Sequence, residues 1–177
     1  LHGFDWLRHL AATRTVEAEQ LARAHVDGWI GRCGHRRHGV AWQPGLTGRR
    51  LLSWLAYASL IMTSDNEVRY DRVMRSISDQ LSYLSRSWNS EPVAEERAHA
   101  LIALATGHLC YRGGELAARR ASGWLVAELG RQLHADGGHV TRNPSVTLAL
   151  LLDLLVLKQC YAERALEMPA AIADLMQ

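Results

Sequence analysis

The chain has 177 residues and a mass of 19.8 kDa, which suits one ordinary domain with a sizeable core. Its composition, 48% hydrophobic and 21% charged, is that of a globular protein, and its net charge of +2 is too small to indicate nucleic-acid binding. Cys33, Cys110 and Cys160 are odd in number and far apart, so they indicate no disulfide framework, although one pair could form.

Apolar residues recur at helical spacing along the whole chain, and no segment shows the two-residue alternation of a strand. A short helix is predicted to begin near Phe4. The other predicted helices follow in order at residues 15–30, 47–62, 67–88, 92–111, 115–134 and 143–163, with a last short one from residue 169.

Several helix starts carry recognisable signals. Ser64 and Glu67 have the spacing of a capping box, in which Ser caps the backbone and Glu reaches back to it. Asn143 is predicted as an N-cap, with Pro144 in the first helical position. Residues 31–48, rich in Gly, Arg and His, are predicted to form a long loop.

The sequence therefore predicts an all-α protein, with residues 1–177 forming one helical domain. Short turns between helices indicate antiparallel hairpins, which two architectures accommodate: an incomplete α/α toroid or an up-and-down bundle. Residues 148–157 are apolar nearly all round their helix, which predicts that this helix is buried. The apolar run contains Asp153 and is short for a membrane span, so none is expected.

The segment 136–144 places more polar groups beside a helix terminus than any other part of the chain. A helix N-terminus favours anions, so Arg142 and Asn143 could hold a carboxylate while His139 exchanges a proton. The alternative is purely structural. Asn143 then caps the helix, the glycines permit the turn, and Arg142 lies on the surface.

Two other groups of histidines have simpler interpretations. The segment 33–38 has metal-ligand residue types, but no second ligand pair is evident and its arginines oppose a cation, so no metal site is predicted. It is expected to be an exposed basic edge. His99 and His108 lie in an otherwise apolar helix and are expected to be buried, hydrogen-bonded histidines.

Trp42, Arg49 and Arg50 form a third constellation across a loop and the start of a helix. Aromatic faces stack on sugar rings and arginines bind acidic groups, so these residues could line a saccharide cleft. The neighbouring Trp54 is expected in the core.

One stretch resembles a known family. It reads Arg131-Gln132-Leu133-His134-Ala135-Asp136-Gly137-Gly138-His139 and then Arg142-Asn143-Pro144, which resembles the Q-x-x-x-D-G-G-H … S/N-P stretch of heparinase II/III-like proteins. Three further segments are similar to the helical N-terminal region of that family: Phe4-Asp5-Trp6-Leu7, the stretch from Trp42 to Trp54, and Leu152-Asp153-Leu154-Leu155.

The resemblance implies an incomplete α/α toroid, followed in a longer protein by a β-sandwich domain that this chain lacks. It also implies a polysaccharide lyase that cleaves uronate-containing acidic polysaccharide by β-elimination without a cofactor. His139 and Asn143 would be catalytic, Arg142 would hold the carboxylate, and Trp42, Arg49 and Arg50 would line the cleft. The family is compatible with a periplasmic location. No signal peptide is visible, and the chain begins at Leu1, so the natural N-terminus is expected to be absent.

The match to the family is incomplete at the residues that carry its chemistry. Val146 and Thr147 stand where active members often have a Tyr-His pair. The segment 91–94 stands where members tend to have an Asn-His pair, although Asn89 lies just upstream. The departures favour a second hypothesis, a non-catalytic helical binding or scaffold module that has lost the lyase chemistry.

Overall fold

The computed structural model describes residues 2–62, 66–134 and 136–176. Within these residues the chain is all-α, as predicted, with nine α-helices, two short 3-10 helices and no strand. The elements are α1 (Leu7–Thr13), α2 (Val16–Cys33), η1 (Val40–Trp42), α3 (Pro44–Ala56), α4 (Ala58–Ile61), α5 (Glu67–Ser87), η2 (Trp88–Ser90), α6 (Ala94–Leu109), α7 (Glu115–Gln132), α8 (Pro144–Glu163) and α9 (Ala170–Asp174).

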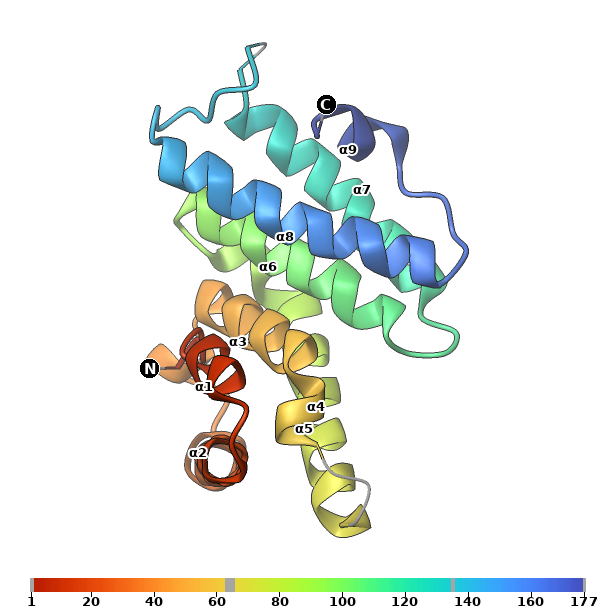
Figure 1. The fold of residues 1–177 in the computed structure, drawn as a ribbon. Coiled ribbons are helices and arrows are strands. Elements are labelled where there is room, and N and C mark those ends of the chain that lie inside the picture. Colours follow the sequence, from red (N-terminus) through yellow and green to blue (C-terminus); the bar gives the residue numbers. More distant parts are fainter. Residues whose placement is uncertain (1, 63–65, 135, 177) are drawn as a thin grey trace.

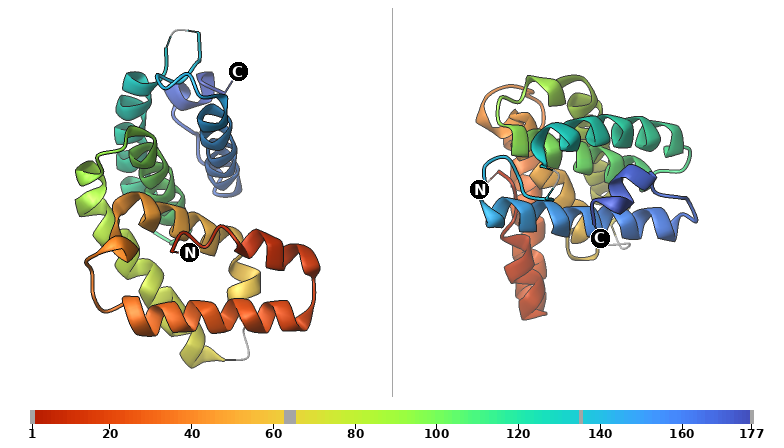
Figure 2. Two further views of the ribbon diagram at one scale, coloured as in Figure 1. Left: turned by 90° about the vertical axis from the view of Figure 1, so that its left-hand side faces the viewer. Right: turned by 90° about the horizontal axis from the view of Figure 1, so that it is seen from above.

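The helices fall into a lower and an upper group in the view of Figure 1, with α1 to α5 below and α6 to α9 above. The central helix is α6, which packs against α3 of the lower group and against α7 and α8 of the upper group. Figure 2 shows α1 folding back along α2 as an antiparallel hairpin. This arrangement does not show the toroid that the sequence suggested.

The central helix is enclosed because its sequence alternates small and large apolar residues. Every residue from Ala98 to Gly107 is buried, and the small ones let neighbouring helices approach closely. At the crossing with α3, a Cβ atom added to Gly48 would lie 2.8 Å from the Cα atom of Ala100. Since backbone cannot yield as a flexible side chain does, the α3–α6 contact requires glycine at position 48.

We predict that Gly48→Val lowers the free energy of unfolding by about 2–4 kcal/mol, because the larger side chain forces α3 away from α6. Urea denaturation followed by circular dichroism measures the change. Gly123→Ala in α7 is the matched control, since a Cβ atom added to Gly123 would meet nothing within 4 Å. That control should stabilise the protein by about 0.5–1 kcal/mol. Equal destabilisation by both variants would contradict a specific close approach at Gly48.

The lower group is built around a buried arginine among tryptophans. The Arg50 side chain is fully buried, and its guanidinium carbon lies 3.9 Å from the centre of the Trp29 ring. It donates to Gln80 Oε1 at 2.7 Å and to the carbonyl oxygens of Ala41 at 2.8 Å and His2 at 3.2 Å. Burial lowers the pKa of Arg50 to about 9, which still leaves the group charged at neutral pH. A cation satisfied by carbonyl oxygens and a ring face thus ties the N-terminal segment to α3 and α5.

Some predicted boundaries differ from the structure. The helix predicted from residue 47 begins at Pro44, because proline suits the first helical turn, and it is interrupted at Tyr57, where α4 follows. Ser64, the predicted cap, lies outside the described residues. The N-cap of α5 is Asn66, whose side chain accepts from the backbone N–H of Arg69 at 2.9 Å.

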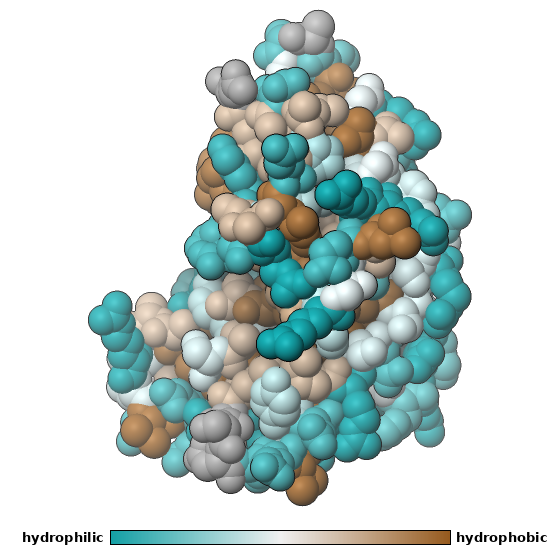
Figure 3. Space-filling model, turned by 90° about the vertical axis from the view of Figure 1, so that its right-hand side faces the viewer, coloured by the Kyte–Doolittle hydropathy of each residue, from teal (hydrophilic) through white to brown (hydrophobic). Residues whose placement is uncertain are grey.

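The prediction that α8 is buried all round is wrong. One side of α8 packs into the core through Leu150, Leu154, Leu157 and Tyr161. The opposite side exposes Leu148 by 57%, Leu152 by 54%, Leu155 by 47% and Val156 by 39%. Among the described helices, α8 alone is long and apolar enough to cross a membrane, by length and composition only. Figure 3 shows hydrophobic residues reaching the surface among hydrophilic ones over the upper group of helices.

Candidate functional site

The segment from residue 136 to residue 144, hereafter the polar loop, is a tight connection between α7 and α8. Leu133 and His139 pair across it as an isolated antiparallel bridge. The backbone N–H of Val140 donates to the carbonyl oxygen of Gln132 at 2.7 Å. The loop therefore folds back on the last turn of α7 before α8 begins, and this return carries the His139 ring into the protein.

Both ring nitrogens of His139 are engaged in hydrogen bonds. The side chain is 1% exposed. Its Nε2 lies 3.1 Å from Gln132 Oε1, and its Nδ1 lies 2.8 Å from Thr141 Oγ1 and accepts from the Thr141 backbone N–H. This pattern fits the neutral tautomer that carries its proton on Nε2. The arrangement leaves no free ring nitrogen to exchange a proton with a ligand, although the catalytic role assigned to His139 stays a prediction.

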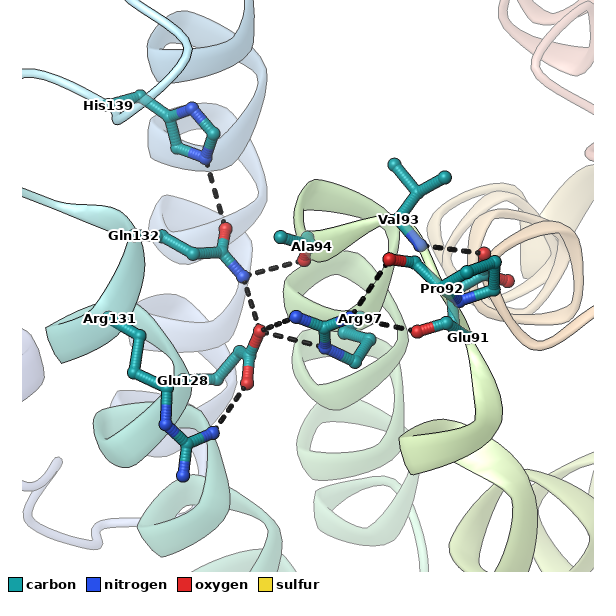
Figure 4. A network of polar contacts seen from close by, with 9 residues as sticks. All are labelled: Glu91, Pro92, Val93, Ala94, Arg97, Glu128, Arg131, Gln132 and His139. Atoms are coloured by element: carbon teal, nitrogen blue, oxygen red, sulfur yellow. Dashed lines mark hydrogen bonds and ion pairs between the residues drawn. The ribbon is translucent and has the colours of Figure 1, made fainter.

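The contacts of His139 continue into a buried polar network (Figure 4). Gln132 Nε2 donates to Ala94 O at 2.6 Å and to Glu128 Oε1 at 2.7 Å. The Glu128 carboxylate, 1% exposed, also forms an ion pair with Arg97 at 2.9 Å and a second with Arg131 at 2.9 Å. One buried carboxylate thus joins α7 to α6 and, through Gln132, to the polar loop.

The network reaches α3 through the segment before α6. Arg97 Nη1 donates to the carbonyl oxygens of Glu91 at 2.9 Å and Pro92 at 3.1 Å. The buried Glu91 carboxylate accepts from the backbone N–H of Gly45 at 3.0 Å, in the first turn of α3. Residues 91–94, where the lyase family tends to have an Asn-His pair, therefore form a structural link between α3 and α6.

The pKa of Glu128 shows the balance between burial and the hydrogen bonds and charges around its carboxyl group. Burial raises the pKa, but hydrogen bonds from Gln132, Arg97 and Arg131 together with the charge of Arg97 outweigh it, so the pKa is lowered. A carboxyl group whose pKa is lower in the folded state stabilises the fold above its unfolded pKa of about 4.3. That stabilisation is lost as the pH falls through the folded pKa.

We predict that Glu128→Gln destabilises the protein by about 1–3 kcal/mol at pH 7, because it removes the charge that pairs with the partly exposed Arg97. Urea denaturation at pH 7 and at acid pH measures this, and the loss caused by the substitution should shrink on acidification through about pH 4. The exposed Glu167→Gln is the control and should change stability by less than about 0.5 kcal/mol. A loss that is the same at both pH values would refute the ionic contribution.

The other two predicted residues of the polar loop lie on its surface. Arg142 pairs with Asp136 at 2.9 Å, and both side chains are exposed. Asn143 Oδ1 accepts from the Ser145 backbone N–H at 3.0 Å, which confirms its capping position at α8. Gly137 and Arg142 have φ of 78° and 54°, in the left-handed region that a tight turn uses. The loop thus has a conformational reason for glycine at position 137.

The predicted cleft-lining residues do not come together at one surface. Trp42 is 1% exposed, and its indole N–H donates to the Cys33 carbonyl oxygen at 2.7 Å. Arg50 is fully buried in the aromatic core. Arg49 alone is partly exposed, and it forms a two-bond ion pair with Glu96 at 3.0 and 2.5 Å. Trp42 and Arg50 are therefore core residues of the lower group.

A groove with several polar lining residues lies between α8 and the helices α1 and α3, and sequence reasoning missed it. This groove has a volume of about 380 Å³, and its polar lining residues are Asp5, Arg8, Arg49, Ser53, Tyr57, His99 and Asp153. Its apolar lining residues are Leu52, Ala56, Ala149, Leu152 and Val156. In Figure 3 the surface is indented above the protruding lower part, which holds α1 and α2. Because Leu152 and Val156 line the groove, it continues the exposed apolar side of α8.

A histidine–aspartate pair forms the wall of this groove. His99 Nδ1 lies 2.7 Å from Asp153 Oδ2. His99 is 5% exposed, which agrees with the prediction that it is buried and hydrogen-bonded. The pair links α6 to α8 across 54 positions of sequence, so no local pattern reveals it. The one signal in the sequence is the charge of Asp153 within an apolar run.

Comparison with known proteins gives one informative similarity. The chain is 28% identical over 173 residues to FtsZ-localized protein C of Caulobacter vibrioides. The match covers 98% of this chain but only 30% of that protein's length. No protein-family model matches the chain, and no solved structure matches it.

This similarity overturns the lyase interpretation. It extends over nearly the whole chain, whereas the resemblance to heparinase II/III-like proteins depends mainly on one loop. The structure supplies a physical reason for the loop motif without lyase chemistry, since His139 fastens the loop and Asn143 caps α8. The assignment to that family, the polysaccharide lyase function and the acidic polysaccharide partner are therefore wrong. That residues 1–177 form a single domain stays a prediction.

Proposed function

We propose that this chain is the helical part of a protein that associates with FtsZ during cell division. The observation that carries the proposal is the similarity to FtsZ-localized protein C over 98% of the chain. Because this chain spans 30% of that relative's length, the activities of the longer protein are not assigned to it.

The exposed side of α8 supports a binding role. Leu148, Leu152 and Leu155 follow one another at the spacing of a single helix face, and each is about half exposed. An apolar stripe beside a polar groove is the usual composition of a protein-binding surface, with an apolar centre and a hydrogen-bonding rim. We assign this surface, α8 together with the groove, to FtsZ.

The α8 framework is held rigidly enough to present such a surface. Its start is fixed by the cap at Asn143, its middle by the bond from Asp153 to His99, and its end by the contact of Tyr161 with Ser122 at 2.8 Å. A preformed surface reduces the entropy lost on binding.

We predict that the double variant Leu148→Ser, Leu152→Ser binds FtsZ about tenfold more weakly or worse, since it removes two central apolar contacts. Co-sedimentation of the chain with assembled FtsZ from the same organism measures this. Leu116→Ser is the matched control, because Leu116 is 74% exposed on α7, away from this surface. Circular dichroism should show both variants folded.

The two possible failures are distinguishable. If the wild-type chain does not sediment with FtsZ, the proposed association is refuted. If the wild-type chain binds and the double variant binds equally well, the association stands and the assignment of the α8 surface is refuted.

A further inference from the structure

A second hollow, hereafter the aromatic pocket, lies between the N-terminal segment and the second half of α2. Its volume is about 420 Å³, within the range of about 300–1,000 Å³ that small-molecule sites occupy. The three residues that α2 contributes to the argument are spaced four and three positions apart, so they share one face of the helix. The lining includes His2, Phe4, Trp6, His25, Trp29 and Arg32.

Four rings form the walls of the aromatic pocket. The centre of the Trp6 ring lies 5.2 Å from that of Phe4 and 5.2 Å from that of His25. The Phe4 ring stands edge-on to the Trp29 ring, with their centres 6.4 Å apart. Because the walls lie in different planes, a flat ring can stack on one wall and meet the edge of another, and both geometries are favourable. The pocket therefore suits a flat aromatic ring system.

The charges around the aromatic pocket favour an anion over a cation. None of its described lining residues is acidic, and Asp5, which stands between Phe4 and Trp6 in the sequence, lines the groove instead. The Arg50 guanidinium carbon lies 3.9 Å from the centre of the Trp29 ring, so this wall already contacts a cation. Aromatic cages commonly bind quaternary ammonium groups, but here the neighbouring positive charge repels them.

Arg32 supplies the cation that a bound anion can pair with. It is exposed and takes part in no ion pair among the described residues. Its Nη2 would lie 3.0 Å from a Cβ atom added to Gly28, so the guanidinium lies beside the turn of α2 that carries Trp29. Burial and the charge of Arg50 lower the pKa of His2, which fits a neutral ring whose Nδ1 accepts from the Trp29 indole N–H at 3.3 Å. The planar fork of arginine matches a carboxylate or a similar oxyanion.

We propose that the aromatic pocket binds a free small molecule that combines a flat aromatic ring system with a carboxylate or a similar anionic group. The ring system lies among Phe4, Trp6 and Trp29, and the anion pairs with Arg32. The pocket shares no lining residue with the groove. The proposal is therefore independent of the FtsZ association.

The test titrates the 177-residue chain with naphthoate and with two analogues of nearly the same shape, the neutral naphthalenemethanol and the cationic naphthylmethylammonium. The indole N–H resonances in heteronuclear NMR spectra give the Kd. We expect a Kd of about 1 mM or tighter for naphthoate, binding of the alcohol weaker by about threefold to fivefold, and the weakest binding for the ammonium. The signals of Trp6 and Trp29 should shift most. Equal affinity for all three compounds, or tightest binding of the cation, would overturn the proposal.

Two variants separate the contributions of charge and ring. Arg32→Gln should weaken naphthoate binding by about threefold to fivefold and leave the alcohol unaffected, since it removes only the ion pair. Arg36→Gln is the matched control, because Arg36 is an exposed arginine outside the lining, and it should change neither Kd. Trp6→Ala should weaken both ligands by about tenfold, and Trp6→Phe, which keeps a ring, by less.

The exposed Arg32 variant keeps the test decisive if loss of the Trp6 ring unfolds the chain, which circular dichroism shows. Naphthoate binding that is unchanged in Arg32→Gln refutes the assigned anion contact. Binding that is instead lost in the double variant Leu148→Ser, Leu152→Ser places the ligand on the apolar side of α8 and refutes the pocket.

Discussion

The ion pair between Arg97 and the buried Glu128 is the contact on which the rest of the arrangement depends. It joins the central helix α6 to α7, and each partner forms a further hydrogen bond. Glu128 accepts from Gln132, and Arg97 donates to a carbonyl oxygen of the segment before α6. Removing Arg97 would leave the buried Glu128 carboxylate without this cation, which is more costly than losing a surface pair. The polar loop is joined to this network by His139, whose side chain is buried and bonds to Gln132.

The sequence predicted those features of the structure that residues close together along the chain determine. The helices, the cap at Asn143 and the core position of Trp54 follow from neighbouring residues, and all are found in the structure. The bond from His99 to Asp153 spans 54 positions, and the burial of Arg50 depends on carbonyl oxygens from other segments. No local pattern contains such information, because these contacts exist only after the helices have packed.

The polar loop shows how one set of residues can suggest chemistry and yet meet structural requirements. A glycine at position 137, an inward histidine and an Asn-Pro helix start each have a structural role in this connection. α8 shows the converse, since its mostly apolar sequence suggested burial, although one side of the helix is exposed. Composition alone does not separate a helix enclosed by protein from one that offers half its surface to a partner. Only the positions of its neighbours make that distinction.

The two side-chain bonds that attach α8 to its neighbours also have a mechanical consequence. Its middle is tied to α6 through Asp153 and its end to α7 through Tyr161. A force applied along the exposed side would load these bonds together, in shear, instead of peeling the helix away from one end. Tension arriving at α8 would therefore be distributed over α6 and α7.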